Sequence, residues 1–138
     1  MGKKQSRSEA RQEAFKLIFQ TQSNSEDVNF LIEQMLENKP ESKQNMDYIR
    51  AALNGVLEKE EELKEDISAN LSGGWKIDRI SRVSLAILKL ALYEIKYMDD
   101  IPVKVSINEA VELDKKFDEP DNSSFINGVL GGFCRKND

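Results

Sequence analysis

Apolar residues recur along this chain at the spacing of helices, and no segment alternates in the manner of a strand. The densest run is 80–98, ISRVSLAILKLALYEIKYM, in which apolar side chains fall on nearly every face of a helix. A helix of this kind is normally buried, so we expect it to form the centre of the fold. Its charge-free runs are far shorter than the roughly 20 apolar residues of a membrane span. Arg82, Lys89 and Lys96 repeat every seven residues, which predicts one stripe that faces water or a partner.

The first half of the chain predicts three helices. The first runs to about Gln22 and opens with a capping box, Ser6-Arg7-Ser8-Glu9, in which hydroxyl and carboxylate satisfy each other's free amide donors. The second covers about 28–38 and stops before Pro40. The third covers about 45–71, with a bend expected at Gly55 or within 58–62. The acidic run EKEEELKED at 58–66 is most simply the solvated face of this helix.

Paired glycines at 72–74, Ser-Gly-Gly, mark the clearest joint in the chain. Trp75 follows at once, and an indole beside a joint usually packs the linker onto a core, with stacking on a ligand as the alternative. Asp78 is the candidate cap of the central helix. Two more helices are expected, one from about Pro102 to Phe117 and a short, glycine-weakened one after the turn-rich loop at 118–124. The chain therefore predicts an all-α fold, with three helices before the joint and three or four after it.

Composition removes most kinds of catalysis. The 138 residues hold no histidine and one cysteine, Cys134, which excludes disulfide frameworks, Cys/His zinc sites and histidine general bases. No glycine-rich phosphate loop, nucleophile elbow or metal-ligand cluster occurs, so we expect no enzyme, no cofactor and no metal site. Asn108 and Glu109, beside a buried face, indicate a structural network rather than a catalytic pair. One thiol and no secretory signal indicate the reducing cytoplasm.

The net charge of −5 conceals a basic opening segment. Residues 1–20 carry only Glu9 and Glu13 as acids, whereas their cations are Lys3, Lys4, Arg7, Arg11 and Lys16. Two cations followed by two aromatics form an i+4 ladder on the first helix: Arg7, Arg11, Phe15 and Phe19. Such a ladder could hold phosphates at one end and stack bases at the other. The alternative is that both phenylalanines are core and both arginines are merely solvated.

Whole segments of the chain add a resemblance. The segment 74–117, GWKIDRISRVSLAILKLALYEIKYMDDIPVKVSINEAVELDKKF, followed by FINGVL at 125–130, resembles the NusB family of bacterial transcription antitermination factors, as does SRSEARQEAFKLIFQ at 6–20. The resemblance implies two small helical bundles packed across one another in a single domain, 1–138, with subdomains 1–72 and 76–138 and a joint at 73–75. Ser106 and Asp114 stand where alanine is usual, which is tolerable if both face outward, and Leu130-Gly131-Gly132 suggests a frayed last helix.

The resemblance also implies a function without bond chemistry. Proteins of this family bind the boxA element of leader and ribosomal RNA transcripts together with the ribosomal protein NusE, in the complex that keeps RNA polymerase elongating through terminators. It places RNA contacts on the opening helix and in the loop before the last helix: Lys3, Lys4, Arg7, Arg11, Phe19, Asp121, Asn122, Ser123, Ser124 and Phe125. It places the protein-partner surface at Ile77, Ile80, Ser84 and Leu88. Neutralising about four phosphates of a single strand would give a log-log salt slope near −3.

Two alternatives stay open at this point. One is a protein-only module, a homodimer or assembly adaptor that covers its basic helix and binds no RNA by itself. The other is the targeting domain of an RNA-modifying enzyme, since helical domains resembling this family precede ribosomal RNA cytosine methyltransferases. That second alternative requires the chain to be a fragment. No membrane partner is expected, and the stripe of Arg82, Lys89 and Lys96 has no assigned role.

Overall fold

The structure, a computed structural model, describes residues 2–23, 27–119 and 122–137. Within these ranges the chain forms seven α-helices, two short 3-10 helices and no strand, which confirms the all-α prediction. The first half holds α1 (Arg7–Ser23), α2 (Val28–Asn38), η1 (Pro40–Asn45), α3 (Met46–Glu58) and α4 (Glu60–Ala69). The second half holds η2 (Ile77–Arg79), α5 (Arg82–Tyr97), α6 (Val103–Phe117) and α7 (Ser123–Lys136). None of the described helices is long and apolar enough to cross a membrane.

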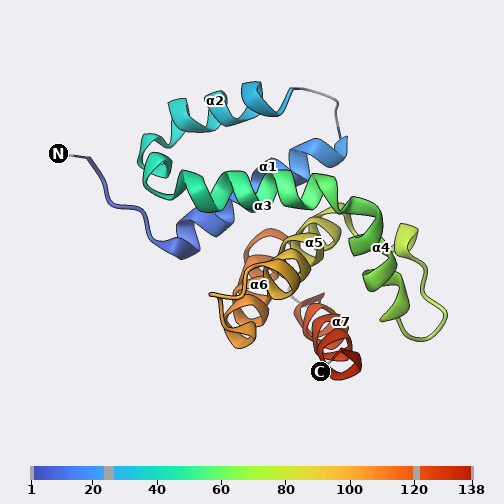
Figure 1. Cartoon of the computed structure of the whole chain (residues 1–138). Helices are drawn as coiled ribbons and strands as arrows, with labels where there is room; N and C mark the ends of the chain where they lie inside the picture. The colour runs from blue at the N-terminus through green and yellow to red at the C-terminus, as the bar shows by residue number, and fades with distance from the viewer. Residues whose placement is uncertain (1, 24–26, 120–121, 138) are drawn as a thin grey trace.

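Helix α5 is the centre of the molecule, as its pattern predicts. It packs against α1, α3, α4, α6 and α7, and its middle is buried on every side. Figure 1 shows α1, α2 and α3 gathered on one side of α5, with α6 and α7 on the other. Helix α4 contacts α3, but also α5 and α7. The division into subdomains 1–72 and 76–138 therefore stays a prediction.

Local signals set most helix ends, with two differences from expectation. Ser81, not Asp78, caps α5, because the Ser81 hydroxyl accepts the Ser84 amide at 2.9 Å. Asp78 lies in η2 instead. The predicted third helix breaks at Lys59 into α3 and α4, inside the expected 58–62 region. Helix α7 continues through its paired glycines to Lys136, so the expected fraying is not seen there.

Gly55 lies inside α3 and allows a close approach to α5. A Cβ atom at this position would lie 2.0 Å from Cζ of Tyr93. Only glycine leaves room for that ring, which explains why α3 carries a residue of poor helix propensity at a buried position. Gly55 thus allows close packing of α3 against α5 and does not bend the helix.

The cationic stripe of α5 and the acidic run of α4 bind each other. Lys89 is only 2% exposed, and its Nζ lies 2.7 Å from Oε1 of Glu60. Nζ of Lys96 lies 2.6 Å from carboxylate oxygens of both Glu62 and Asp66. The expectation of a stripe facing water or a partner is wrong for these two lysines, and the acidic run is not simply a solvated face. Arg82 alone of the three is exposed.

Candidate nucleic-acid interface

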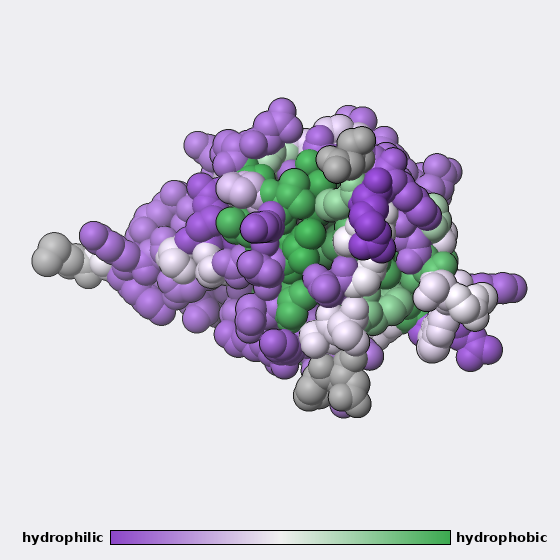
Figure 2. Space-filling model, turned by 90° about the horizontal axis from the view of Figure 1, so that it is seen from below, coloured by the Kyte–Doolittle hydropathy of each residue, from purple (hydrophilic) through white to green (hydrophobic). Residues whose placement is uncertain are grey.

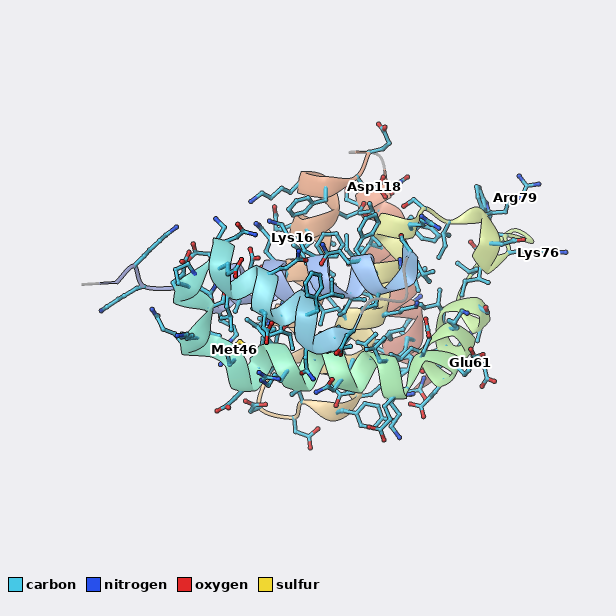
Figure 3. The ribbon with its side chains drawn as sticks, turned by 90° about the horizontal axis from the view of Figure 1, so that it is seen from above. Lys16, Met46, Glu61, Lys76, Arg79 and Asp118 are labelled. Atoms are coloured by element: carbon cyan, nitrogen blue, oxygen red, sulfur yellow. The ribbon has the colours of Figure 1, made fainter. Side chains whose placement is uncertain are left out.

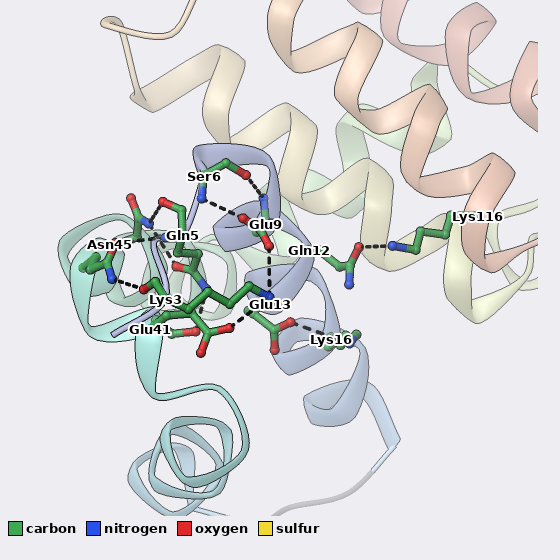
Figure 4. Close-up of polar contacts among 12 residues, drawn as sticks. Lys3, Gln5, Ser6, Glu9, Gln12, Glu13, Lys16, Glu41, Asn45 and Lys116 are labelled. Atoms are coloured by element: carbon green, nitrogen blue, oxygen red, sulfur yellow. Dashed lines mark hydrogen bonds and ion pairs between the residues drawn. The ribbon is translucent and has the colours of Figure 1, made fainter. Parts of the chain in front are cut away.

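The opening segment before α1 is held against η1 by side-chain amides (Figure 4). Nε2 of Gln5 donates to the Ser42 hydroxyl at 2.7 Å, and Oε1 of Gln5 accepts from Asn45 at 2.9 Å. Nε2 of Gln44 donates to the backbone carbonyl of Lys3 at 2.7 Å. These bonds give the basic residues of the segment a defined position.

The predicted capping box at the start of α1 is confirmed. The Ser6 hydroxyl accepts the Glu9 amide at 3.0 Å, and Oε1 of Glu9 accepts the Ser6 amide at 2.9 Å. The hydrogen bonds from Ser6 hold the pKa of Glu9 below its usual value. The Glu9 carboxylate therefore caps the N-terminus of α1.

Three predicted RNA-contact residues remain exposed at this end of α1: Lys3, Lys4 and Arg7. The Lys3 ammonium lies 3.8 Å from carboxylate oxygens of Glu9 and Glu41. Both pairs are long and Lys3 is exposed, so their stabilising value is small. The Arg7 guanidinium lies 4.7 Å from the centroid of the Tyr48 ring. Lys4 makes no ion pair with any described residue. All three cations can reach phosphates.

Arg11 needs correction as a phosphate contact, because it is buried. Its side chain is 3% exposed, with Nε 2.8 Å from Oε2 of Glu94 and Nη2 3.1 Å from Oε1. The Tyr48 hydroxyl and the Ser106 hydroxyl donate to the same carboxylate. Nη1 of Arg11 lies 3.3 Å from Glu109, which confirms a structural role for that acid. The alternative of a solvated Arg11 fails as well.

The buried network around Glu94 keeps its charges in place. Burial alone lowers the pKa of Arg11, but the hydrogen bonds and charge of Glu94 outweigh it, and the pKa is raised. Burial, together with the Glu94 charge, raises the pKa of Tyr48. Arg11 thus stays a cation and Tyr48 a neutral donor, so the network ties α1 and α3 to α5.

Two cations that the RNA-contact prediction did not include lie beside the middle of α1: Lys16 on α1 itself and Lys116 on α6. Phe15 is core and Phe19 is half-buried against it, with ring centroids 6.3 Å apart. On the flank toward α6, the Lys16 ammonium lies 5.9 Å from the Phe117 ring centroid. Lys116 donates to Oε1 of Gln12 at 2.7 Å (Figure 4). Lys116 comes from another helix, so spacing along α1 could not reveal it.

The far end of α1 contacts the start of α5. Nε2 of Gln22 donates to the backbone carbonyl of Arg82 at 3.0 Å. Asn122 precedes α7 as its N-cap residue, and Ser123, Ser124 and Phe125 form its first turn. Asp121 lies outside the described residues. Helix α1 has 17 residues, so its axis is about 25 Å long.

The loop and part of the predicted partner surface share one pocket of about 240 Å³. Its lining residues are Trp75, Arg79, Ile80, Ser81, Ser84, Asn122 and Phe125. Ile77 and Ile80 are partly exposed. Ser84 and Leu88 are buried, so their assignment to a contact surface needs correction. The structure brings residues of the predicted RNA-contact loop and of the predicted partner surface into one pocket, which the sequence alone did not indicate.

Ser84 instead organises two carboxylates behind this pocket. Its hydroxyl lies 3.1 Å from Oδ1 of Asp114 and 2.9 Å from Oδ2 of Asp118. Asp114 is 0% exposed, and burial raises its pKa to about 6. The condition that Ser106 and Asp114 face outward is not met, because both are buried and hydrogen-bonded. Among the described residues, no group of three or more acidic, histidine or cysteine side chains could hold a metal ion.

Trp75 does not pack the joint onto the core, contrary to the favoured interpretation. Its side chain is 58% exposed. The Trp75 amide donates to the Ser72 carbonyl at 3.2 Å, across a turn in which Gly73 and Gly74 have φ of 64° and 77°. Positive φ at both positions favours glycine. The joint is therefore a formed turn that presents the indole to solvent.

The model of the NusB family matches residues 8–135 of this sequence. The chain belongs to the NusB family. It is 37% identical over 131 residues to the transcription antitermination protein NusB of Clostridium novyi, covering 94% of this chain and 98% of that protein. It is 40% identical over 140 residues to the protein of the same name from Clostridium botulinum, covering 91% and 96%. The family is one of antitermination factors, so this chain is not an enzyme.

Solved structures share the fold. The structure of T. maritima NusB superimposes with a TM-score of 0.86 at 30% identity, covering 97% of this chain and 94% of that one. A crystal structure of the antitermination factors NusB and NusE in complex with dsRNA matches with a TM-score of 0.80, covering 94% and 96%. At 23% identity this second match shows the fold alone.

Proposed function

We propose that this chain binds single-stranded boxA RNA of leader and ribosomal RNA transcripts together with the ribosomal protein NusE. In doing so it acts in the cytoplasm as a scaffold of the complex that keeps RNA polymerase elongating. The observation that carries the proposal is the set of exposed cations at the start of α1, Lys3, Lys4 and Arg7, with Lys16 and Lys116 farther along the helix. A structure of the same fold, solved with NusE and dsRNA, supports RNA and NusE as classes of partner.

Phosphates would be neutralised by the cations along α1 and its flank. These are Lys3, Lys4, Arg7, Lys16 and Lys116, with Arg11 left out because it is buried. Five phosphate contacts on a single strand would give a log-log salt slope of about −3.5. The contacts position the strand and carry no sequence information.

Bases would be read at the two places where aromatic and amide groups adjoin this track. Phe19 is half-buried on α1, and Asn122 and Phe125 line the pocket beside Ile80. Unpaired bases are recognised by stacking on aromatic rings and by hydrogen bonds at their edges. The net charge of −5 disfavours binding to arbitrary RNA. Specificity would therefore depend on NusE docking beside Ile77 and Ile80.

The test replaces the cations at the open end of α1. A Lys3→Ala, Lys4→Ala, Arg7→Ala variant is expected to bind boxA RNA more weakly, with a salt slope shallower by about 2. Fluorescence anisotropy of labelled RNA at several salt concentrations measures both. The matched control, Arg50→Ala, Lys64→Ala, Arg135→Ala, removes the same charge from other helices. Equal losses in the two variants would place the site away from α1.

Binding of the RNA should also strengthen when NusE is added, and no enhancement would contradict joint binding. Sedimentation at several protein concentrations, with and without RNA, tests the alternative of a homodimeric adaptor. Concentration-dependent dimers that do not bind RNA would replace the proposal with that alternative.

A further inference from the structure

Trp75 is the only tryptophan of the chain, and most of its side chain is exposed. It lies with Arg79 in the lining of the pocket shared by the RNA-contact loop and Ile80. We infer that Trp75 and Arg79 form a stacking site for one unpaired base of single-stranded RNA. This inference rests on the proposed function and extends it to residues outside α1 and the 122–125 turn.

The pocket has the amphipathic lining that a nucleobase needs. Trp75, Phe125 and Ile80 supply apolar surface, while Asn122 and Ser81 are polar residues of the lining. Its volume of about 240 Å³ lies below the roughly 300–1,000 Å³ usual for small-molecule sites, which suits one flat ring system. Aromatic stacking combined with edge hydrogen bonds is the usual way in which proteins hold unpaired bases.

A second hollow adjoins the first. It has a volume of about 250 Å³ and is lined by Gly73, Gly74, Trp75 and Arg79. The two hollows share Trp75 and Arg79, so open space surrounds these side chains beyond the first pocket. The glycine turn keeps other side chains away from the indole, since neither glycine carries a Cβ atom.

Charge favours RNA over a protein side chain as the occupant. Arg79 and Lys76 are exposed, and neither forms an ion pair with any described residue. Figure 3 shows both projecting from the same end of the molecule. Asp78 is the exposed acid between them. Asp118, behind the pocket, already accepts hydrogen bonds from Ser81 and Ser84, so its charge is partly satisfied. A phosphate next to the stacked base would complement the two free cations.

Because Trp75 is the sole tryptophan, its fluorescence reports on this pocket directly. Titration of the full chain with single-stranded boxA RNA should quench that fluorescence. Trp75→Leu should weaken RNA binding roughly 5- to 150-fold, the range for loss of one stacked base. The matched control is Phe30→Leu, which removes another exposed aromatic and should leave binding unchanged. Arg79→Ala should make the salt slope shallower by about 0.7, and Arg50→Ala should not.

A series of RNAs, each lacking one base, identifies the stacked nucleotide. One member of the series should lose little further affinity when combined with Trp75→Leu, because both changes remove the same contact. Circular dichroism checks that the variants are folded, which the exposure of Trp75 favours.

The outcomes separate this inference from the proposed function. If RNA binds without changing Trp75 fluorescence, and Trp75→Leu binds as tightly as the parent, the stacking site is wrong and the proposed function stands. If only NusE changes the fluorescence and Trp75→Leu weakens NusE binding alone, the pocket is a protein contact and the inference fails. If the unaltered chain binds no boxA RNA with or without NusE, the proposed function itself fails.

Discussion

The Arg11 guanidinium and the Glu94 carboxylate form an ion pair in which both side chains are buried. Taking two charges out of water costs several kcal/mol for each ion. Hydrogen bonds from Tyr48 and Ser106 to the same carboxylate offset part of that cost. The sequence placed Arg11 on a ladder of RNA contacts because its partner lies 83 residues away, and no local pattern reveals such a pairing.

Removing Arg11 should destabilise the fold rather than simply weaken RNA binding. Arg11→Met leaves the Glu94 charge buried without a partner, and we expect a loss of about 3–5 kcal/mol in the free energy of unfolding. Urea denaturation measures it. The control is Arg7→Met, which loses one exposed cation-π contact worth about 1 kcal/mol or less. Equal losses in the two variants would contradict the buried network.

Asp114 should make stability fall as the pH rises. Its folded pKa of about 6 exceeds the ordinary value of 3.8, so the folded state holds the proton more tightly than the unfolded chain. The destabilisation therefore develops between about pH 4 and pH 6 and is complete above that range, at roughly 3 kcal/mol or less. Asp114→Asn should thus be more stable than the parent at pH 8, with a smaller advantage at pH 5.

Asp118→Asn provides the opposite case in the same cluster. Burial raises the pKa of Asp118, but hydrogen bonds from Ser81, the Glu119 amide and Ser84 outweigh it, so the pKa is lowered. Its charged form stabilises the fold at neutral pH, and this contribution is lost as the pH falls. Thermal unfolding at several pH values should show opposite trends for the two variants. The same trend in both would contradict the assignment.

At the scale of elements, local signals decide helix ends and long-range packing decides helix faces. The capping box at Ser6 and the stop before Pro40 lie within a few residues of the ends that they set, so the sequence predicted them. Which faces of α4 and α5 are buried could not be predicted from the sequence. Lys89 and Glu60 lie 29 residues apart and form their ion pair only because the chain turns at Gly73-Gly74. Each of the two sequence patterns, the acidic run at 58–66 and the cationic stripe of α5, is by itself typical of a solvent-exposed helix face.

Alanine substitutions are expected to have opposite effects at two glycines, Gly55 at the contact between α3 and α5 and Gly128 on α7. Gly55→Ala should destabilise the protein by about 1–3 kcal/mol, because the added methyl group would overlap the Tyr93 ring. Gly128→Ala, in α7, meets no atom within 4 Å and should stabilise the helix by up to about 1 kcal/mol. Denaturant unfolding measures both. Stabilisation by Gly55→Ala would mean that the Tyr93 ring moves aside freely.

At the scale of the whole molecule, α5 joins helices from both halves of the chain into a continuous core. Figure 2, a view from below, shows apolar surface in a central band flanked by polar side chains. The family resemblance predicted the fold over most of the chain, because whole segments carried it. The site residues expected from the sequence stay predictions, apart from the buried Arg11, Ser84 and Leu88, which needed correction. The sequence did not predict that Lys116 lies beside α1, or that Arg79 shares a pocket with Asn122 and Phe125, because both positions depend on helix packing.

This shared core predicts a single unfolding transition. Helix α1 contacts both α3 and α5, and the Arg11–Glu94 pair spans the same boundary, so neither half should unfold alone. Far-UV circular dichroism in urea should give one cooperative transition. Hydrogen exchange of amides in α3 and α6 should give similar free energies of opening. Two separate transitions would show that 1–72 and 76–138 are independent folding units.

The ion pair between Lys89 and Glu60 has a consequence for the evolution of related chains. Lys89 is buried, so a substitution that removes the Glu60 carboxylate leaves a buried ammonium without its partner. Such a change lowers the free energy of unfolding and would be selected against. Lineages that lose one of the two residues should therefore lose the other soon after. Across relatives, the positions equivalent to 60 and 89 should change together, whereas the exposed acid at Glu61 should vary independently of both.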